Sequence, residues 1–131
     1  MRKEPIRLSR KLARGWRAAC CLFAAIVLFS LTAALGAEPP QVEVRLTEYT
    51  IDMPKTLPAG PTTFLVRNEG RNSHSLKIVG QGVDELLAAP VPPHGTGTLQ
   101  VTLQAGEYTV YCPVGRHASK GMTLKLVVTA K

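Results

Sequence analysis

The sequence is poor in cysteine. It has three cysteines among 131 residues, and two of them, Cys20 and Cys21, lie within the first 37 residues. Only Cys112 remains in the rest of the chain, so no disulfide can form within residues 38–131. A lone thiol of this kind is buried and inert, is paired with another chain, or is used for chemistry.

Residues 38–131 also lack an excess of charge of either sign. The whole chain has a formal net charge of +7, but residues 1–37 hold seven basic residues against one acidic residue. The remainder carries nine basic and eight acidic side chains, with no basic stripe and no interleaved aromatic residues. Because nucleic-acid binding depends on such a stripe, we expect no nucleic-acid partner.

Groupings that are typical of enzymes are missing as well. The sequence offers no serine, histidine and aspartate set, no pair of carboxylates to flank a cleft, and no second metal cluster for oxygen chemistry. We therefore expect that the protein is not an enzyme.

The N-terminal part has the order of an export signal. A basic head precedes Ala18–Ala37, a stretch that has no charged residue and ends in small residues. This order predicts a signal peptide in residues 1–37, cleaved near Ala37, and one folded domain in residues 38–131. Because about 20 apolar residues can also span a bilayer, an uncleaved anchor is the alternative, and only that form would contact a membrane. In either form the domain is expected in the periplasm or outside the cell.

Short strands are predicted throughout the domain. Apolar and polar residues alternate with a period of two, and turn residues rich in proline and glycine separate the segments. Residues 83–89 are expected to form a loop, because prolines follow at once. About seven short strands predict an all-β fold, an antiparallel Greek-key β-sandwich. The expected strands are residues 42–46, 49–51, 62–67, 75–79, 98–103, 108–112 and 122–129.

One loop between two expected strands combines three metal-binding residue types. Cys112, His117 and Met122 follow one another with four residues in each interval, so one loop can bring their side chains to a single point. His74, at the start of an earlier strand, can supply a fourth ligand. A thiolate and two imidazoles in a plane, with a weak axial thioether, are the ligands of blue-copper centres. Zinc has little use for methionine, so the predicted cofactor is one type 1 copper ion.

Each of these residues has an ordinary structural interpretation when it is taken alone. A single histidine in a strand is often a hydrogen-bonded structural residue, and a lone cysteine or methionine often belongs to the core. Four correct donor types, three of them at fixed spacing, favour the copper site over these interpretations. His94 is expected to be only a turn residue.

The chain resembles the cupredoxins of the plastocyanin and azurin type. The segments His74-Ser75-Leu76 and Tyr111-Cys112-Pro113 follow that family's order of features, and the loop spacing is most similar to longer-loop members such as rusticyanin. The resemblance implies that His74, Cys112 and His117 are the equatorial ligands and that Met122 is the long axial ligand. It also implies that Ser75 ties the His74 segment to the Cys112 loop. The same order of features continues in Leu57–Gly60, Phe64–Gly70 and Leu103–Tyr108.

The resemblance implies a carrier of single electrons between redox proteins. We expect a monomer with transient partners, such as a c-type cytochrome or an oxidase. Electrons would leave through the exposed edge of His117, in an apolar patch that includes Val114 and Ala118 and is rimmed by Arg116 and Lys120. Copper storage or delivery by the same ligands is the first alternative. A structural or adhesion domain with a vestigial site is the second.

Overall fold

The computed structural model of the protein describes residues 38–131, and the expected signal or anchor in residues 1–37 lies outside the described part. The described chain has nine strands and one short 3-10 helix, η1 (Ala118–Lys120). No helix in this part is long and apolar enough to cross a membrane. The strands are β1 (Gln41–Thr47), β2 (Thr50–Asp52), β3 (Thr56–Pro58), β4 (Gly60–Asn68), β5 (Lys77–Gly80), β6 (Val83–Leu86), β7 (Thr96–Leu103), β8 (Gly106–Tyr111) and β9 (Thr123–Thr129).

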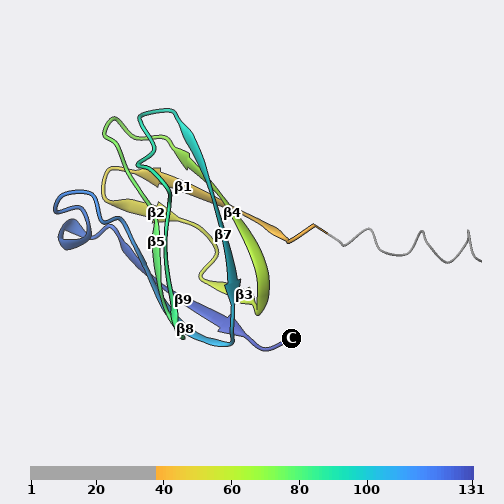
Figure 1. Cartoon of the computed structure of the whole chain (residues 1–131). Helices are drawn as coiled ribbons and strands as arrows, with labels where there is room; N and C mark the ends of the chain where they lie inside the picture. Colours follow the sequence, from red (N-terminus) through yellow and green to blue (C-terminus); the bar gives the residue numbers. More distant parts are fainter. Residues whose placement is uncertain (1–37) are drawn as a thin grey trace, which may run out of the picture. The chain divides into compact units, whose positions relative to one another are not determined.

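The strands form two sheets that pack face to face (Figure 1). One sheet has four strands in the order β2-β1-β4-β7, and the other has five in the order β3-β9-β8-β5-β6. The predicted all-β sandwich is confirmed.

Two strand pairs are parallel rather than antiparallel. β1 runs parallel to β4, and β3 runs parallel to β9. Between β1 and β4 the chain crosses to the other sheet as β3, and this long connection lets β4 run in the same direction as β1. The other pairs are antiparallel.

Alternate residues of the strands fill the core between the sheets. In β1 the buried residues are Val42, Val44 and Leu46, while the residues between them are exposed. The same alternation in β8 buries Tyr108 and Val110. Full burial of one such apolar side chain stabilises the fold by about 1.5–3 kcal/mol, so a register shift of one residue would be strongly unfavourable.

The expected strand over residues 49–51 is the second arm of a tight hairpin. β1 ends at Thr47, Glu48 and Tyr49 form the turn, and β2 returns antiparallel to β1. Tyr49 adopts a φ of 63°, which belongs to the left-handed region that large side chains rarely occupy. The alternation of Val42, Val44 and Leu46 slips before Tyr49, and this slip, which the sequence suggests as a bulge, is a hairpin turn.

β6 occupies residues 83–86 of the loop that was expected over residues 83–89, and only residues 87–89 lie outside a strand. It pairs antiparallel with β5 through a two-residue turn, Gln81 and Gly82, and both turn residues have positive φ, as hairpins of this type require. Across the pair, the Nζ of Lys77 lies 2.7 Å from a carboxylate oxygen of Asp84. Most of β6 is exposed, so its sequence lacks the apolar alternation that predicts a strand.

A buried asparagine connects the loops at one end of the sandwich. The side chain of Asn68, at the end of β4, donates hydrogen bonds to the carbonyl oxygens of Asn72 (2.8 Å) and Val91 (2.9 Å). Its own carbonyl oxygen accepts a hydrogen bond from the N–H of Gly70 (2.9 Å). Val91 also forms two backbone hydrogen bonds with His74, of 3.1 and 2.7 Å. The backbone that carries His74 is therefore fixed from both sides.

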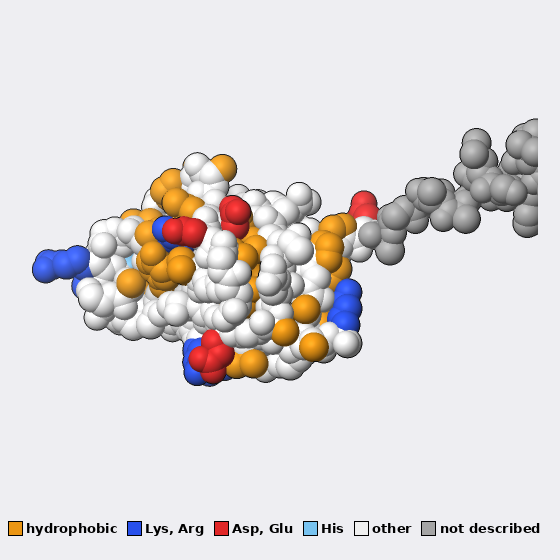
Figure 2. All heavy atoms as spheres, turned by 60° about the horizontal axis from the view of Figure 1, so that its bottom comes forward, with side chains coloured by type: hydrophobic (Ala, Val, Ile, Leu, Met, Phe, Trp, Pro, Cys, Tyr) orange, Lys and Arg blue, Asp and Glu red, His pale blue; other side chains and the backbone are white. Residues whose placement is uncertain are grey.

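Charged side chains on the face shown in Figure 2 lie in small groups, and acidic and basic side chains touch at two places. The ion pairs of the described residues include Lys77 with Asp84 and Lys125 with Glu107, each 2.7 Å long. Exposed pairs of this kind contribute little to stability, about 0–1 kcal/mol each.

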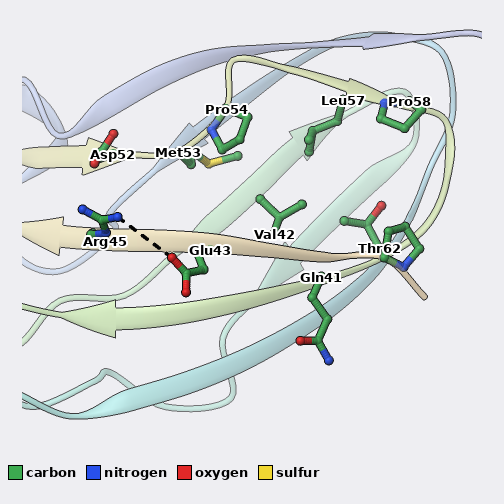
Figure 3. Close-up of a pocket in the computed structure, with 11 residues that line it drawn as sticks. Gln41, Val42, Glu43, Arg45, Asp52, Met53, Pro54, Leu57, Pro58 and Thr62 are labelled. Atoms are coloured by element: carbon green, nitrogen blue, oxygen red, sulfur yellow. Dashed lines mark ion pairs between the residues drawn. The ribbon is translucent and has the colours of Figure 1, made fainter. Parts of the chain in front are cut away.

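A groove of about 650 Å³ lies beside β1 and the segment that joins β2 to β3 (Figure 3). Val42, Met53 and Leu57 contribute to its apolar lining, and the ion pair of Arg45 with Glu43, 4.0 Å long, lies next to them. None of the four predicted copper ligands lines this groove. It is therefore separate from the predicted site.

Candidate metal centre

Three of the four predicted ligands meet in the structure. The ligand atoms of His74, Cys112 and His117 all lie within 4.8 Å of one another. The Nδ1 atom of His117 lies 3.2 Å from the Nδ1 atom of His74 and 3.6 Å from the Sγ atom of Cys112. The two imidazoles therefore face each other through Nδ1, and the thiol sulfur lies beside Nδ1 of His117. This arrangement suits a small cation with nitrogen and sulfur ligands.

The loop between β8 and β9 is closed by its own backbone. Cys112 directly follows β8, and its N–H donates to the carbonyl oxygen of Met122 at 3.1 Å. The N–H of Met122 in turn donates to the carbonyl oxygen of His117, also at 3.1 Å. η1 fills the interval after His117 and ends at Gly121, which has a φ of 103° that glycine adopts without strain. The equal spacing in the sequence thus corresponds to a compact loop.

Met122 is fully buried at the same end of the core. Its backbone is bonded to those of both Cys112 and His117, so the loop brings all three residues together. The role of its sulfur as the axial ligand stays a prediction.

The His74 segment is tied to the Cys112 loop by Ser75, as the resemblance implied. The bond runs from the backbone N–H of Ser75 to the Sγ atom of Cys112, at 3.4 Å, and does not use the serine hydroxyl. A donor of this kind stabilises a thiolate, and hydrogen bonding at the cysteine sulfur is one factor that tunes blue-copper potentials.

Burial and charge keep His74 in the form that binds metals. Its side chain is fully buried, and this burial lowers the pKa of His74 below the ordinary value for histidine. The neighbouring His117 lowers that pKa further, whereas Glu48 partly offsets the shift. A neutral imidazole is the metal-binding form of histidine, so both main influences favour a ligand.

His94 lies outside this group. It is exposed, has a φ of 59°, and occupies a turn in which the N–H of Gly95 donates to the carbonyl oxygen of Pro92 at 2.9 Å. This placement fits the turn residue that the sequence predicts.

Two residues next to the histidines were not singled out from the sequence, and both belong to the β1–β2 turn. The ring of Tyr49 stands edge-on to that of His117, with 5.4 Å between ring centroids. Lys120 donates to the hydroxyl of Tyr49 at 2.9 Å. An oxygen atom of Glu48 lies 3.8 Å from Nε2 of His74. The only signal in the sequence is the break in alternation before Tyr49, which gives no indication of a metal site.

Solved structures with the same fold include several auracyanins. An auracyanin from Roseiflexus castenholzii has 22% identity and a TM-score of 0.57, and the match covers 72% of this chain and 99% of that one. Auracyanin B has 20% identity and a TM-score of 0.61, with 72% and 93% covered. Auracyanin A, a "blue" copper protein from Chloroflexus aurantiacus, has 21% identity and a TM-score of 0.58, with 70% and 99% covered.

No family model and no curated protein matches the chain. The likeness to solved structures therefore concerns the fold, and it agrees with the two-sheet topology and with the group of two histidines and one cysteine. The domain formed by residues 38–131 has the cupredoxin fold.

Proposed function

We propose that this domain binds one type 1 copper ion through His74, Cys112, His117 and Met122 and transfers single electrons. The observation that carries the proposal is the convergence of one nitrogen from each of two histidines and one thiol sulfur within 4.8 Å, at one end of a cupredoxin fold. A matched structure of the same fold, auracyanin A, is itself a blue copper protein. The ligand set of one cysteine, two histidines and a methionine is the set that such centres use.

The surroundings of the ligands favour electron transfer over chemistry that requires movement. His74 is held by two backbone bonds to Val91, and the Cys112 loop is held by bonds within itself. Ligand residues held in this way move little when the charge of a bound ion changes. The structural reorganisation that accompanies each electron transfer is therefore small. Copper bound there supplies the change of oxidation state.

We propose that the protein is an electron carrier and not an enzyme. Copper enzymes also occur among the structures that match this fold. The match covers 42% of the chain of a multicopper oxidase and 27% of that of a copper-containing nitrite reductase, but 93% of one chain of a heme-copper terminal oxidase. Three of the predicted copper ligands are buried, and His117 is half-buried. A buried centre of this kind suits electrons better than a substrate.

The half-buried ring of His117 is the proposed exit for electrons. Val114 and Ala118 are half-buried beside it in the loop, while Arg116 and Lys120 are exposed at its rim. The ring of Tyr49 packs edge-on against that of His117, so less of the His117 ring is accessible to a partner than the sequence implied. A small apolar patch with a basic rim suits brief docking of an acidic redox partner, such as a c-type cytochrome or an oxidase.

We also propose that the domain is exported from the cytoplasm. The basic head and uncharged stretch in residues 1–37 support delivery of a monomeric domain to the periplasm or the exterior, with an uncleaved anchor as the alternative. Either form would expose the domain to redox partners in that compartment.

Loading the purified domain with copper tests the site directly. We expect one copper ion per chain and an intense blue or green colour, because a bound thiolate gives strong charge transfer to cupric copper. His74→Ala or His117→Ala should bleach or greatly alter the visible spectrum, since each removes a ligand. His94→Ala is the matched control, and its spectrum should equal that of the parent. A colourless parent, a preference for zinc, or bleaching of the His94 variant would contradict the assignment.

Met122 should tune the midpoint potential. Its thioether is a weak axial donor, and a stronger donor stabilises the cupric form relative to the cuprous form. We therefore expect Met122→Gln to lower the potential and Met122→Leu to raise it, with copper retained in both variants. Voltammetry is the measurement, and an unchanged potential in both variants would remove Met122 from the ligand set.

A further inference from the structure

We propose that Glu48 is a positioning residue of the metal centre, where it accepts a hydrogen bond from Nε2 of His74 and lowers the midpoint potential. This inference rests on the proposed copper site. The rest of the site leaves one ring nitrogen of His74 unpaired.

The Nε2 atom of His74 is buried and has no hydrogen-bond partner, and no other buried side-chain nitrogen or oxygen within residues 38–131 is in this state. The opposite ring nitrogen, Nδ1, faces His117 at 3.2 Å. A neutral imidazole that binds a metal through Nδ1 carries its proton on Nε2. That N–H then requires an acceptor, because an unpaired buried donor costs about 1–3 kcal/mol.

Glu48 offers this acceptor. Its Oε1 atom lies 3.8 Å from Nε2 of His74. Hydrogen bonds between nitrogen and oxygen measure about 2.7–3.2 Å, so an approach of about 1 Å forms the bond. Histidines that bind metals commonly donate their second N–H to a carboxylate, a carbonyl oxygen or water.

The carboxylate of Glu48 is held in place by the loop that leads to His74. Its Oε1 atom accepts hydrogen bonds from the backbone N–H groups of Arg71 and of Asn72, the latter at 3.1 Å. The bond from Arg71 is the main reason that the pKa of Glu48 lies below its ordinary value, so the side chain remains a carboxylate. A side chain at Gly70 would bring its Cβ within 2.7 Å of the same oxygen, so this close approach depends on glycine.

A carboxylate in this position acts on His74 in two ways. It fixes the orientation of the imidazole, and it raises the basicity of the nitrogen that faces the metal. A more basic ligand and a nearby negative charge both favour the cupric form over the cuprous form. Glu48 therefore lowers the midpoint potential of a copper ion bound at this site.

Glu48→Gln tests the inference with little change of shape. The glutamine carbonyl oxygen can still accept from Arg71 and Asn72, so the loop is retained while the charge is lost. We expect the midpoint potential to shift upward with copper retained. In the cuprous protein, we expect the proton resonance of the His74 Nε2–H to move upfield, because a hydrogen bond to a carboxylate is stronger than one to an amide.

Glu69→Gln is the matched control, because it removes the same charge from an exposed carboxylate on the loop that leads to His74. It should leave the Nε2–H resonance in place and shift the potential less. If Glu48→Gln does not fold, Glu48→Asp is the second variant, because its shorter side chain withdraws the carboxylate from His74 and keeps the charge. It should also raise the midpoint potential and move the Nε2–H resonance upfield. A Glu48 variant that matches the control in both readouts overturns the inference.

Copper binding and the protonation of His74 are measured separately, so the copper site and the role of Glu48 can fail independently. A parent protein that binds no copper overturns the proposed function, and the copper-free proteins then decide the role of Glu48. Nitrogen-15 spectra of histidine report which ring nitrogen carries the proton. If Glu48 pairs with Nε2, the Nε2–H form of His74 should dominate in the parent and decrease in Glu48→Gln. An unchanged distribution overturns the inference without copper.

Discussion

Cys112→Ser should abolish the intense visible absorption of the copper-loaded domain. The colour arises from transfer of charge out of a thiolate, and a serine hydroxyl has no comparable high-energy sulfur electrons to transfer. Neither histidine can replace this donor, because an imidazole nitrogen does not give the intense charge transfer of a thiolate. We expect complete loss of the intense band, with any copper that remains giving only a weak colour.

The fold should tolerate this replacement. Cys112 follows β8, and its backbone bond to Met122 does not involve the side chain. The serine hydroxyl would be buried beside His117 and the backbone N–H of Ser75, and its burial costs about 1–3 kcal/mol when it is poorly hydrogen-bonded. Circular dichroism and thermal unfolding of the copper-free variant should therefore show the native fold with somewhat lower stability.

Ser75→Ala provides the control for the cysteine variant. It removes a buried hydroxyl but keeps the backbone N–H that donates to the Cys112 sulfur at 3.4 Å. We expect its copper-loaded form to keep the intense band. Persistence of that band in Cys112→Ser would show that the colour does not come from this thiolate, and the proposed ligand set would be wrong.

The fold could be predicted from the sequence where alternation is regular. β1, β7, β8 and β9 bury alternate residues, and β4 does so from Phe64 onward, so the pattern indicates both the strand and the side that faces the core. β6 was not predicted, because an exposed edge strand needs no apolar face and its sequence shows no alternation. Its position is set by the Gln81–Gly82 turn and by pairing with β5, and only the first of these is a local signal.

The candidate site was predictable where its residues are close in the sequence. Cys112, His117 and Met122 share one loop, and a regular spacing of metal-binding residue types is visible before the fold is known. His74 required the resemblance as well, because it comes from another loop. Glu48 and Tyr49 could not be found in this way. They reach the histidines only because β1 ends beside both loops, and residue type alone gives a glutamate or a tyrosine in a turn no special meaning.

Electron transfer and copper delivery share these ligands and differ in what reduction does to the bound ion. A carrier must keep its copper through repeated cycles, whereas a delivery protein must release it to an acceptor. Because His74 and the Cys112 loop are fixed by backbone hydrogen bonds, we expect the cuprous ion to stay bound. The measurement is the copper content after repeated reduction and oxidation in the presence of a copper acceptor.

The same carrier should exchange electrons rapidly with a c-type cytochrome, and Val114→Glu should slow the exchange by roughly tenfold or more. Val114 is half-buried in the ligand loop, so a carboxylate there disrupts the apolar contact next to His117 and repels an acidic partner. The visible spectrum should be unchanged, because the side chain is not a ligand. Stopped-flow mixing with the cytochrome measures the rate.

Leu65→Glu separates docking from a general effect of charge. Leu65 is 36% exposed in β4, in the sheet opposite the one that contains β8 and β9, and the variant adds the same negative charge. We expect its exchange rate to stay close to that of the parent. Equal slowing by Leu65→Glu and Val114→Glu would place the exit for electrons elsewhere than His117. Stoichiometric loss of copper to the acceptor on reduction, with negligible exchange, would establish delivery as the function, because a site that empties on reduction cannot carry the next electron.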